Sequence, residues 1–389
     1  MPLDRSTLDQ AVDDSFQALS RLALKIHESP ELAYQEHKAC GWIAEEVERA
    51  GVSVERAVGG VETAFRARVG KGQGPRVAIL AEYDALPEIG HACGHNLIAA
   101  GAVGAFLALS RQPGALAGSV ELIGTPAEEG GGGKIKLLDA GVFEGVDVAM
   151  MYHPYDRDIL AHPALATKRV TMKFRGSPSH ASIAPWDGQS ALTACLETFR
   201  LIDSQRVHFR DGVRVHGIVT DGGQAVNIIP EHAESLFLLR APSIEELERI
   251  AKIVERCARG AALAAGAEVD VNMRNGYKNM RNNLALARRF GAALELHGRS
   301  PREADPSVGA GSTDMGDVSH AVPSIHPYLA ICDEGETLCH EHAFAACARS
   351  ERGFETMRVA AKAMARTAAD ALEDATLLAA ARAEFAARD

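Results

Sequence analysis

A thiol and an imidazole lie two residues apart in the run Gly90-His91-Ala92-Cys93-Gly94-His95-Asn96, and a second imidazole comes just before them. Cysteine thiolate and neutral imidazole are ligands for borderline-soft divalent metals such as zinc. The alternative for Cys93 is plain packing, because buried cysteine often behaves as a small apolar residue. The spacing therefore indicates a candidate metal site that needs further donors elsewhere in the chain.

Carboxylates that could supply such donors stand in a second run, Pro126-Ala127-Glu128-Glu129-Gly130-Gly131-Gly132-Gly133. Four consecutive glycines are flexible, and they indicate a close approach of the backbone to something bound. The alternative reading is a solvated acidic turn. Both runs follow expected strands, at residues 77–81 and 120–124. Because sites in α/β proteins gather at the carboxyl ends of parallel strands, the two runs together predict a metal-dependent hydrolytic site.

The first third of the chain alternates helical and strand patterns, as a mostly parallel sheet covered by helices requires. Gly51 stands where a helix C-terminal cap is expected. Helical periodicity covers residues 6–28, 35–50 and 97–110, and strand patterns cover residues 63–69, 76–81, 120–124 and 147–152.

The pattern changes near Lys168 to the order strand, helix, strand, strand, helix, strand, which resembles a ferredoxin-like insert. These elements are expected at residues 169–174, 188–202, 213–219, 232–240, 244–265 and 268–273, and helices resume at 283–297 and 350–374. The predicted fold class is therefore α/β. A mostly parallel catalytic domain spans residues 1–166 and 282–389, and an α+β domain is inserted at residues 167–281.

Composition narrows the class of protein further. A chain of 389 residues favours two domains, and the net charge of −11 without a long basic run argues against nucleic acid or an anionic membrane as a partner. The first residues show no signal peptide, and no apolar stretch approaches the length that spans a bilayer. Seven cysteines, an odd count, fit reduced thiols, so we expect a cytoplasmic protein.

Further motifs occur in order along nearly the whole chain. They are Glu82-Tyr83-Asp84-Ala85-Leu86-Pro87, His153-Pro154, Ser179-His180-Ala181-Ser182, Asn227-Ile228-Ile229-Pro230, Gly311-Ser312-Thr313-Asp314 and Leu338-Cys339-His340. With the two runs above, they make the sequence resemble the dinuclear metallopeptidase and amidohydrolase family of aminoacylase, carboxypeptidase G and the auxin-conjugate amidohydrolases. The nearest branch is that of aminobenzoyl-glutamate hydrolase and the β-alanyl dipeptidases.

The resemblance implies two divalent metal ions held by Cys93, His95, Glu129, His153 and His340. Zinc or manganese is expected first, and cobalt or nickel also suits such mixed ligands. The thiolate of Cys93 would bridge the two ions. For His153 a capping or core role is the alternative, and for His340 the competing ligand is His342.

Two positions depart from the wider family. Relatives with a different motif place a metal-binding histidine where Glu82 stands, so Glu82 is not assigned to metal. Many auxin-conjugate enzymes have Asp where this chain has Asn96. This difference weakens the inference that the chain shares their substrate specificity.

Catalytic roles also follow from the resemblance. Glu128 is the expected general base, and Asp84 either orients a ligating imidazole or is a turn residue. His180 and Asn227, in the insert, would bind substrate and polarise the scissile carbonyl when the domains close. Arg240 would pair with a substrate carboxylate, unless it is simply an exposed residue at a strand end.

The expected function is metal-dependent hydrolysis of an amide or peptide bond in a small N-acyl amino acid, an aromatic acyl–amino acid conjugate or a dipeptide, through a metal-activated water. One alternative is a hydrolase with Cys93 as its nucleophile. Another is a non-catalytic metal- or ligand-binding protein on the same fold. The insert would act as a lid and dimerisation domain, giving a homodimer in which His180 serves the partner subunit's site.

Overall fold

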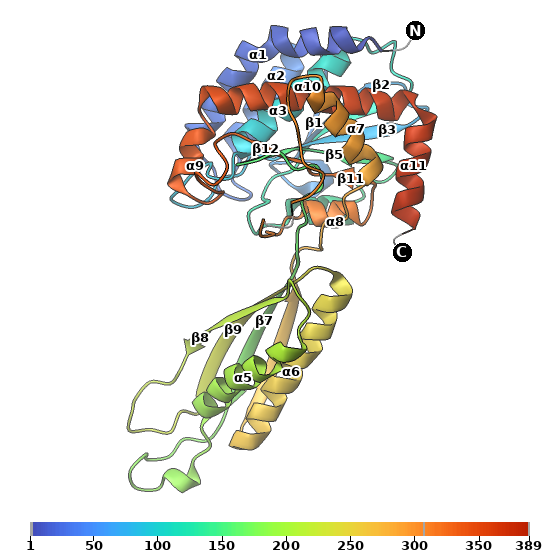
Figure 1. Cartoon of the computed structure of the whole chain (residues 1–389). Coiled ribbons are helices and arrows are strands. Elements are labelled where there is room, and N and C mark those ends of the chain that lie inside the picture. The colour runs from blue at the N-terminus through green and yellow to red at the C-terminus, as the bar shows by residue number, and fades with distance from the viewer. Residues whose placement is uncertain (1–2, 306–307, 388–389) are drawn as a thin grey trace. The chain divides into compact units, whose positions relative to one another are not determined.

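The computed structural model describes residues 3–305 and 308–387 (Figure 1). It divides into two compact units. Unit 1 comprises Met1–Pro163, Arg281–Ala310 and Asp314–Asp389, and unit 2 comprises Ala164–Met280 and Gly311–Thr313. The domain ranges expected from the sequence also include residues 1–2, 306–307 and 388–389, which lie outside the described residues.

Unit 1 is built on a sheet that has six strands in the described part of the chain. In spatial order they are β1 (Val54–Arg56), β2 (Phe65–Gly70), β4 (Ser119–Gly124), β3 (Arg76–Ala81), β5 (Val148–Met150) and β11 (Ser324–Ile325). Strands β4, β3, β5 and β11 run parallel, whereas β1 and β2 form an antiparallel edge. Because β3 and β4 are parallel neighbours, the polar segments that follow them begin at the same edge of the sheet.

Helices cover this sheet (Figure 1). They are α1 (Arg5–His27), α2 (His37–Arg49), α3 (His95–Ser110), α4 (Gly133–Asp139), α7 (Leu284–Glu295), α8 (Met315–Ser319), α9 (His342–Cys347), α10 (Glu351–Glu373) and α11 (Ala375–Ala386), with a 3₁₀ turn, η1, at Val58–Gly60. A short parallel pair, β6 (His153–Tyr155) with β12 (Tyr328–Ala330), completes unit 1.

Helix α3 is the central helix of unit 1, because nearly all of its residues are buried. Its small side chains allow close packing: a Cβ at Gly104 would lie 2.7 Å from the Leu19 side chain, and one at Gly101 would lie 2.7 Å from that of Tyr152. The first residue of this helix is His95. Packing on all sides therefore fixes the position of a predicted metal ligand.

Unit 2 has a ferredoxin-like topology. Its elements in chain order are β7 (Ala166–Arg175), η2 (Pro185–Asp187), α5 (Ala191–Gln205), η3 (Arg206–His208), β8 (Arg214–Asp221), β9 (His232–Ala241), α6 (Ile244–Ala265) and β10 (Glu268–Asn275). The sheet order is β10-β7-β9-β8, and every neighbouring pair is antiparallel. Both helices pack on one face, over a core that includes Phe174, Phe237 and Ile250.

The predicted α/β class, with a parallel-rich sheet and an inserted α+β domain, is confirmed. The differences concern element ends and short elements that the sequence analysis did not predict. The helix expected at residues 188–202 begins at Ala191, because the side chain of Ser190 caps it by accepting a hydrogen bond from the Thr193 N–H. The strand expected at 147–152 is shorter in the structure, where β5 ends at Met150, and the separate strand β6 begins after it at His153. Among the described residues, no helix is long and apolar enough to cross a bilayer.

Candidate metal centre

The loop that carries Cys93 is held in a tight turn where α3 begins. Gly94, between Cys93 and His95, has φ +76°, a left-handed conformation that favours glycine. A Cβ at this position would lie 2.7 Å from the side chain of Pro154, the residue that follows His153. Glycine at position 94 therefore lets the Cys93 loop approach the strand that carries His153.

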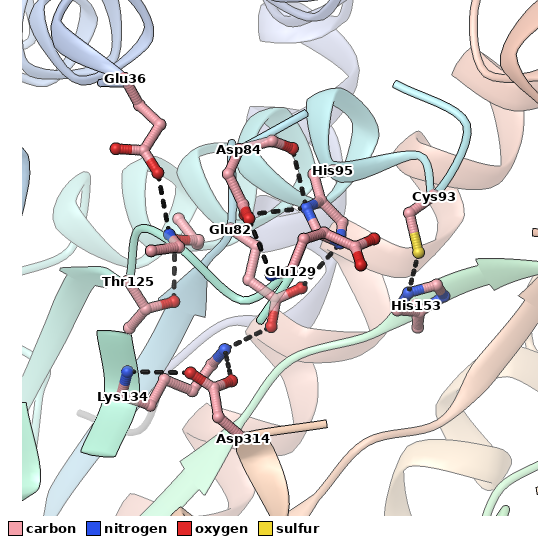
Figure 2. Close-up of polar contacts among 12 residues, drawn as sticks. Glu36, Glu82, Asp84, Cys93, His95, Thr125, Glu129, Lys134, His153 and Asp314 are labelled. Atoms are coloured by element: carbon pink, nitrogen blue, oxygen red, sulfur yellow. Dashed lines mark hydrogen bonds and ion pairs between the residues drawn. The ribbon is translucent and has the colours of Figure 1, made fainter. Parts of the chain in front are cut away.

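The five side chains that the sequence analysis assigned to metal come together in unit 1. Donor atoms of Cys93, His95 and His153 lie within 4.8 Å of one another, and so do those of Cys93, Glu129 and His340. The Cys93 Sγ and His153 Nε2 atoms are 3.3 Å apart, as Figure 2 shows. Glu129 Oε1 and His340 Nε2 are also 3.3 Å apart. Cys93 belongs to both groups, which is the arrangement expected of a bridging ligand.

Hydrogen bonds orient the two buried imidazoles toward this cluster. The Nδ1 of His95 is 2.9 Å from the Asp84 carbonyl and 3.0 Å from Asp84 Oδ1, and the Nδ1 of His153 is 2.7 Å from the Pro154 carbonyl. These acceptors assign the proton to Nδ1 in each ring, because a carbonyl cannot donate. The Nε2 atoms are then directed into the cluster, and the neutral ring of each histidine would offer its Nε2 lone pair to an ion.

The donor set fits divalent ions. Two ligands that each lie about 2.1 Å from one tetrahedral ion are about 3.4 Å apart, close to the separations found here. The buried atoms His95 Nε2 and Glu129 Oε1 make no hydrogen bond, and their ion-pair contacts are Glu82 Oε2 at 3.5 Å and His340 Nε2 at 3.3 Å. Buried polar atoms normally have hydrogen bonds, so these two atoms are suited to ligation. Thiolate, imidazole and carboxylate together suit zinc, manganese, cobalt or nickel.

Asp84 lies directly behind two of these donors. One carboxylate oxygen faces the His95 ring, and the other accepts a hydrogen bond of 2.9 Å from the Glu129 backbone N–H. Burial alone would raise the pKa of Asp84, but the His95 charge and these hydrogen bonds hold it below its ordinary value. Asp84 therefore contacts two parts of the centre rather than forming only a turn.

The loop that carries Glu128 and Glu129 is clamped at both ends. The buried Glu36 carboxylate accepts a hydrogen bond of 2.9 Å from the N–H of Ala127, whose φ is +61°. The Tyr34 hydroxyl donates to the Gly131 carbonyl at 2.6 Å. These contacts hold the carboxylate pair at a fixed place despite the glycines. The sequence analysis missed both clamping residues, since neither belongs to the motifs it used.

Glu128 is buried close to several other carboxylates. Its carboxylate is grouped with His95 and Glu129 on one side and with Glu82 and Asp314 on the other. Burial first, and then the charges of Glu82 and Glu129, raise its pKa well above the ordinary value. A carboxylate in such surroundings is disposed to take up a proton, which is the property that a general base uses.

A buried ion-pair network adjoins Glu128. Lys134 Nζ lies 2.5 Å from Glu82 Oε1 and 2.5 Å from Asp314 Oδ1 (Figure 2). Both partners raise the pKa of Lys134 against the effect of its burial. The sequence analysis quoted Glu82 and Asp314 in motifs without giving them a role, and it missed Lys134. No local pattern identifies that lysine as buried.

His340 reaches the centre through an unusual backbone conformation. Its φ is +72°, and its N–H donates to the Ala92 carbonyl at 2.9 Å, beside Cys93. Its side chain is 55% exposed, and Glu129 raises its pKa. His342, the competing candidate, is the first residue of α9 and is absent from the donor groups formed by the described residues. The geometry therefore favours His340 over His342.

The three remaining candidates lie in unit 2. His180 forms an isolated β-bridge with Ile228, and the Ala181 N–H donates to the Asn227 carbonyl at 3.0 Å, so His180 and Asn227 are neighbours. Both are exposed. Arg240, near the end of β9, donates from Nη1 to the Ser312 hydroxyl at 3.1 Å. Their expected action on substrate stays a prediction.

Comparison with known proteins identifies relatives over nearly the full length. The mouse Xaa-Arg dipeptidase is 39% identical, across 97% of this chain and 90% of that protein. A p-aminobenzoyl-glutamate hydrolase chain from Escherichia coli (strain K12) is 28% identical, across 95% and 92%. The solved structure of Bacillus subtilis YXEP, a dinuclear metal binding peptidase, has a TM-score of 0.75 at 22% identity, across 93% and 99%. At 22% identity, this structural likeness shows the fold alone.

The family model also matches most of the chain. The model of peptidase family M20/M25/M40 covers residues 78–370, which include the Cys93 and Glu128 motifs and His340. The family resemblance read from the motifs is confirmed, and the chain belongs to peptidase family M20/M25/M40.

Proposed function

We propose that this chain is a metal-dependent hydrolase that cleaves the amide bond of a small dipeptide or N-acyl amino acid. The observation that carries the proposal is the convergence of Cys93, His95, Glu129, His153 and His340 beside the buried carboxylate of Glu128. Such mixed donors hold ions while leaving positions open for water and substrate. The resemblance to an Xaa-Arg dipeptidase and to an aminobenzoyl-glutamate hydrolase supports small amide substrates.

In the proposed mechanism each protein group has one task. When bound, two divalent ions, zinc or manganese first, would polarise the carbonyl and lower the pKa of a water toward about 7. Glu128 takes the proton of the attacking water and passes it to the leaving nitrogen. Asp84 keeps the His95 ring and the Glu129 backbone in place. His180 and Asn227 donate hydrogen bonds to the developing oxyanion.

Arg240 is the proposed partner of the substrate carboxylate. Its guanidinium presents several fixed donors that match a carboxylate, and its hydrogen bond to Ser312 uses only one of its nitrogens. Dipeptides and N-acyl amino acids both end in such a carboxylate.

All seven cysteines are free thiols, which fits the proposed cytoplasmic location.

A Cys93-nucleophile hydrolase is the second candidate, because Cys93 Sγ lies 3.3 Å from His153 Nε2. The surroundings argue against it. The contact with Cys339, burial and the nearby carboxylates Glu129 and Glu128 raise the pKa of Cys93 well above its ordinary value. A thiol held protonated is a poor nucleophile, whereas a divalent ion would stabilise the thiolate.

A substrate panel tests the proposed function. The panel contains dipeptides with basic, acidic and apolar C-terminal residues, β-alanyl dipeptides, N-acyl amino acids and aromatic acyl conjugates, each assayed with manganese or zinc and again with a chelator. We expect amide cleavage of at least one class, detected as free amine, and its loss with chelator. Cleavage that persists after verified metal removal favours the cysteine nucleophile. Metal binding without turnover of any class favours a binding protein.

The proposed assembly is a homodimer formed through unit 2. Strand β8 is an edge strand of the sheet, and its side chains Ile218 and Val219 are 61% and 40% exposed. An exposed apolar edge is a template for pairing with a second chain. Two-fold pairing at this edge agrees with the expectation, drawn from the family resemblance, that His180 serves the partner subunit's site.

Mixing two inactive variants tests this assembly. We expect His180→Ala and Glu128→Gln chains to be inactive alone and to regain activity when co-refolded or exchanged, up to about half per heterodimer by two-fold symmetry. In each heterodimer, one active site then contains both substitutions and the other active site contains neither. Subunit exchange shown by mass spectrometry without regained activity would place His180 in its own chain's site.

A further inference from the structure

Glu82 lies beside the metal centre with one carboxylate oxygen already held. It follows β3 directly and is fully buried. Its Oε1 is 2.5 Å from Lys134 Nζ. Its Oε2 has no hydrogen-bond partner. A buried carboxylate oxygen without a partner is costly, so this atom needs an explanation.

The unpaired oxygen faces an unpaired nitrogen. Glu82 Oε2 lies 3.5 Å from His95 Nε2, and that nitrogen also has no hydrogen-bond partner. A cation must lie between these two atoms. It is the Nε2 proton when the ring is charged, and a bound ion when Nε2 acts as a ligand, because a ligating imidazole is neutral. Two ligands of one tetrahedral ion are separated by about 3.4 Å, which matches the distance observed.

The net negative charge of the carboxylates around Glu82 also favours binding of a cation. Oxygen atoms of Glu82, Glu128 and Asp314 lie within 4.8 Å of one another. Lys134 is shared by Glu82 and Asp314, so its single charge leaves this buried group negative. Like charges at such separations are strongly unfavourable in a buried site unless a proton or a metal cation compensates them.

We propose that Glu82 is a sixth donor of the metal centre, binding through Oε2 the ion that His95 holds, and that Lys134 is the positioning residue that limits Glu82 to one oxygen. This inference rests on the proposed function, because it requires a metal centre at Cys93 and His95. Lys134 occupies Oε1 and is itself fixed, since its backbone N–H donates to Asp314 Oδ2 at 2.9 Å. With Lys134 on Oε1, Glu82 can offer the ion only Oε2, and the orientation of that oxygen is fixed.

The test uses Glu82→Gln and cobalt as the probe. The full chain is stripped with a chelator, reloaded with cobalt and followed by visible absorption, with metal content measured by elemental analysis. For Glu82→Gln we expect one of two ions to bind at least about tenfold more weakly, with altered absorption bands, while the other ion binds as in the wild type. Both readouts are independent of turnover.

Glu121→Gln is the matched control. Glu121 is also fully buried on the same sheet and ion-paired, with its Oε1 2.6 Å from Arg76 Nε. The control makes the same chemical change and removes a buried ion pair outside the centre, so cobalt affinity and absorption should match the wild type. If Glu82→Gln matches this control in both readouts, the assignment of Glu82 is overturned. If the wild type binds no cobalt, the proposed function itself fails.

A charge-balanced variant keeps the test decisive if Glu82→Gln does not fold. Lys134→Met with Asp314→Asn removes one cation and one anion, and leaves an amide oxygen that can accept the backbone hydrogen bond at position 134. Glu82 Oε1 is then released, so we expect the cobalt bands to shift as a second carboxylate oxygen binds. An unchanged spectrum in this folded variant would overturn the role of Lys134, and an unchanged spectrum after Glu82→Gln is added to the same variant would overturn the assignment of Glu82.

Discussion

Replacing Glu128 with glutamine is expected to lower the turnover of substrate by about 10²–10⁴-fold while the metal content stays at the wild-type level. Glutamine keeps the shape of the side chain in its buried place but cannot take a proton from the attacking water. Glu129, the neighbouring proposed ligand, keeps its contact with Asp84 through its backbone N–H, so the donor set is preserved. Single-turnover kinetics and elemental analysis measure the two quantities.

Glu121→Gln again serves as the control, because it makes the same substitution at a buried, ion-paired carboxylate outside the centre. Its turnover is expected to match the wild type if the chain folds normally. A Glu128→Gln chain that keeps more than about a tenth of the wild-type rate would mean that another group is the base.

Blocking Cys93 is expected to abolish activity by preventing metal binding. The thiolate is the form that coordinates, and an alkylated or oxidised sulfur binds ions poorly. Donor atoms of Cys93 belong to both groups of proposed ligands, so its loss affects both ions rather than one. We expect alkylation of the metal-free chain to prevent reloading, and bound metal to protect Cys93 in peptide mapping by mass spectrometry.

Cys93→Ala gives the genetic counterpart, with Cys195→Ala as its control. Cys195 is a fully buried cysteine in the core of unit 2, so its replacement costs packing without removing a proposed ligand. Full activity with Cys93 stoichiometrically blocked, or normal metal content in Cys93→Ala, would exclude the ligand role.

The sequence predicted best those features that local chemistry determines. Helix α6 begins and ends at the predicted residues, because the side chain of Ser243 caps its start and Gly266, with φ +68°, ends it. The short motifs identified the family, and the family resemblance in turn implied the proposed ligands.

The features that the sequence analysis missed depend on contacts between distant segments. Glu36 and Ala127 are 91 positions apart, and Lys134 and Asp314 are 180 apart, so no local pattern links them. The antiparallel edge formed by β1 and β2 was missed for the same reason, since strand order is a tertiary property. Strands as short as β11 and β12 also leave too few residues for a periodic signal.

The most direct test of the proposed metal-dependent hydrolysis is a metal titration of turnover. The chain is stripped of metal, its metal content is verified by elemental analysis, and zinc or manganese is added in steps while cleavage of the best substrate from the panel is followed. The proposed two-ion centre predicts no turnover above background in the metal-free chain and full activity near two equivalents per chain. Undiminished turnover by the verified metal-free chain would contradict the proposed mechanism.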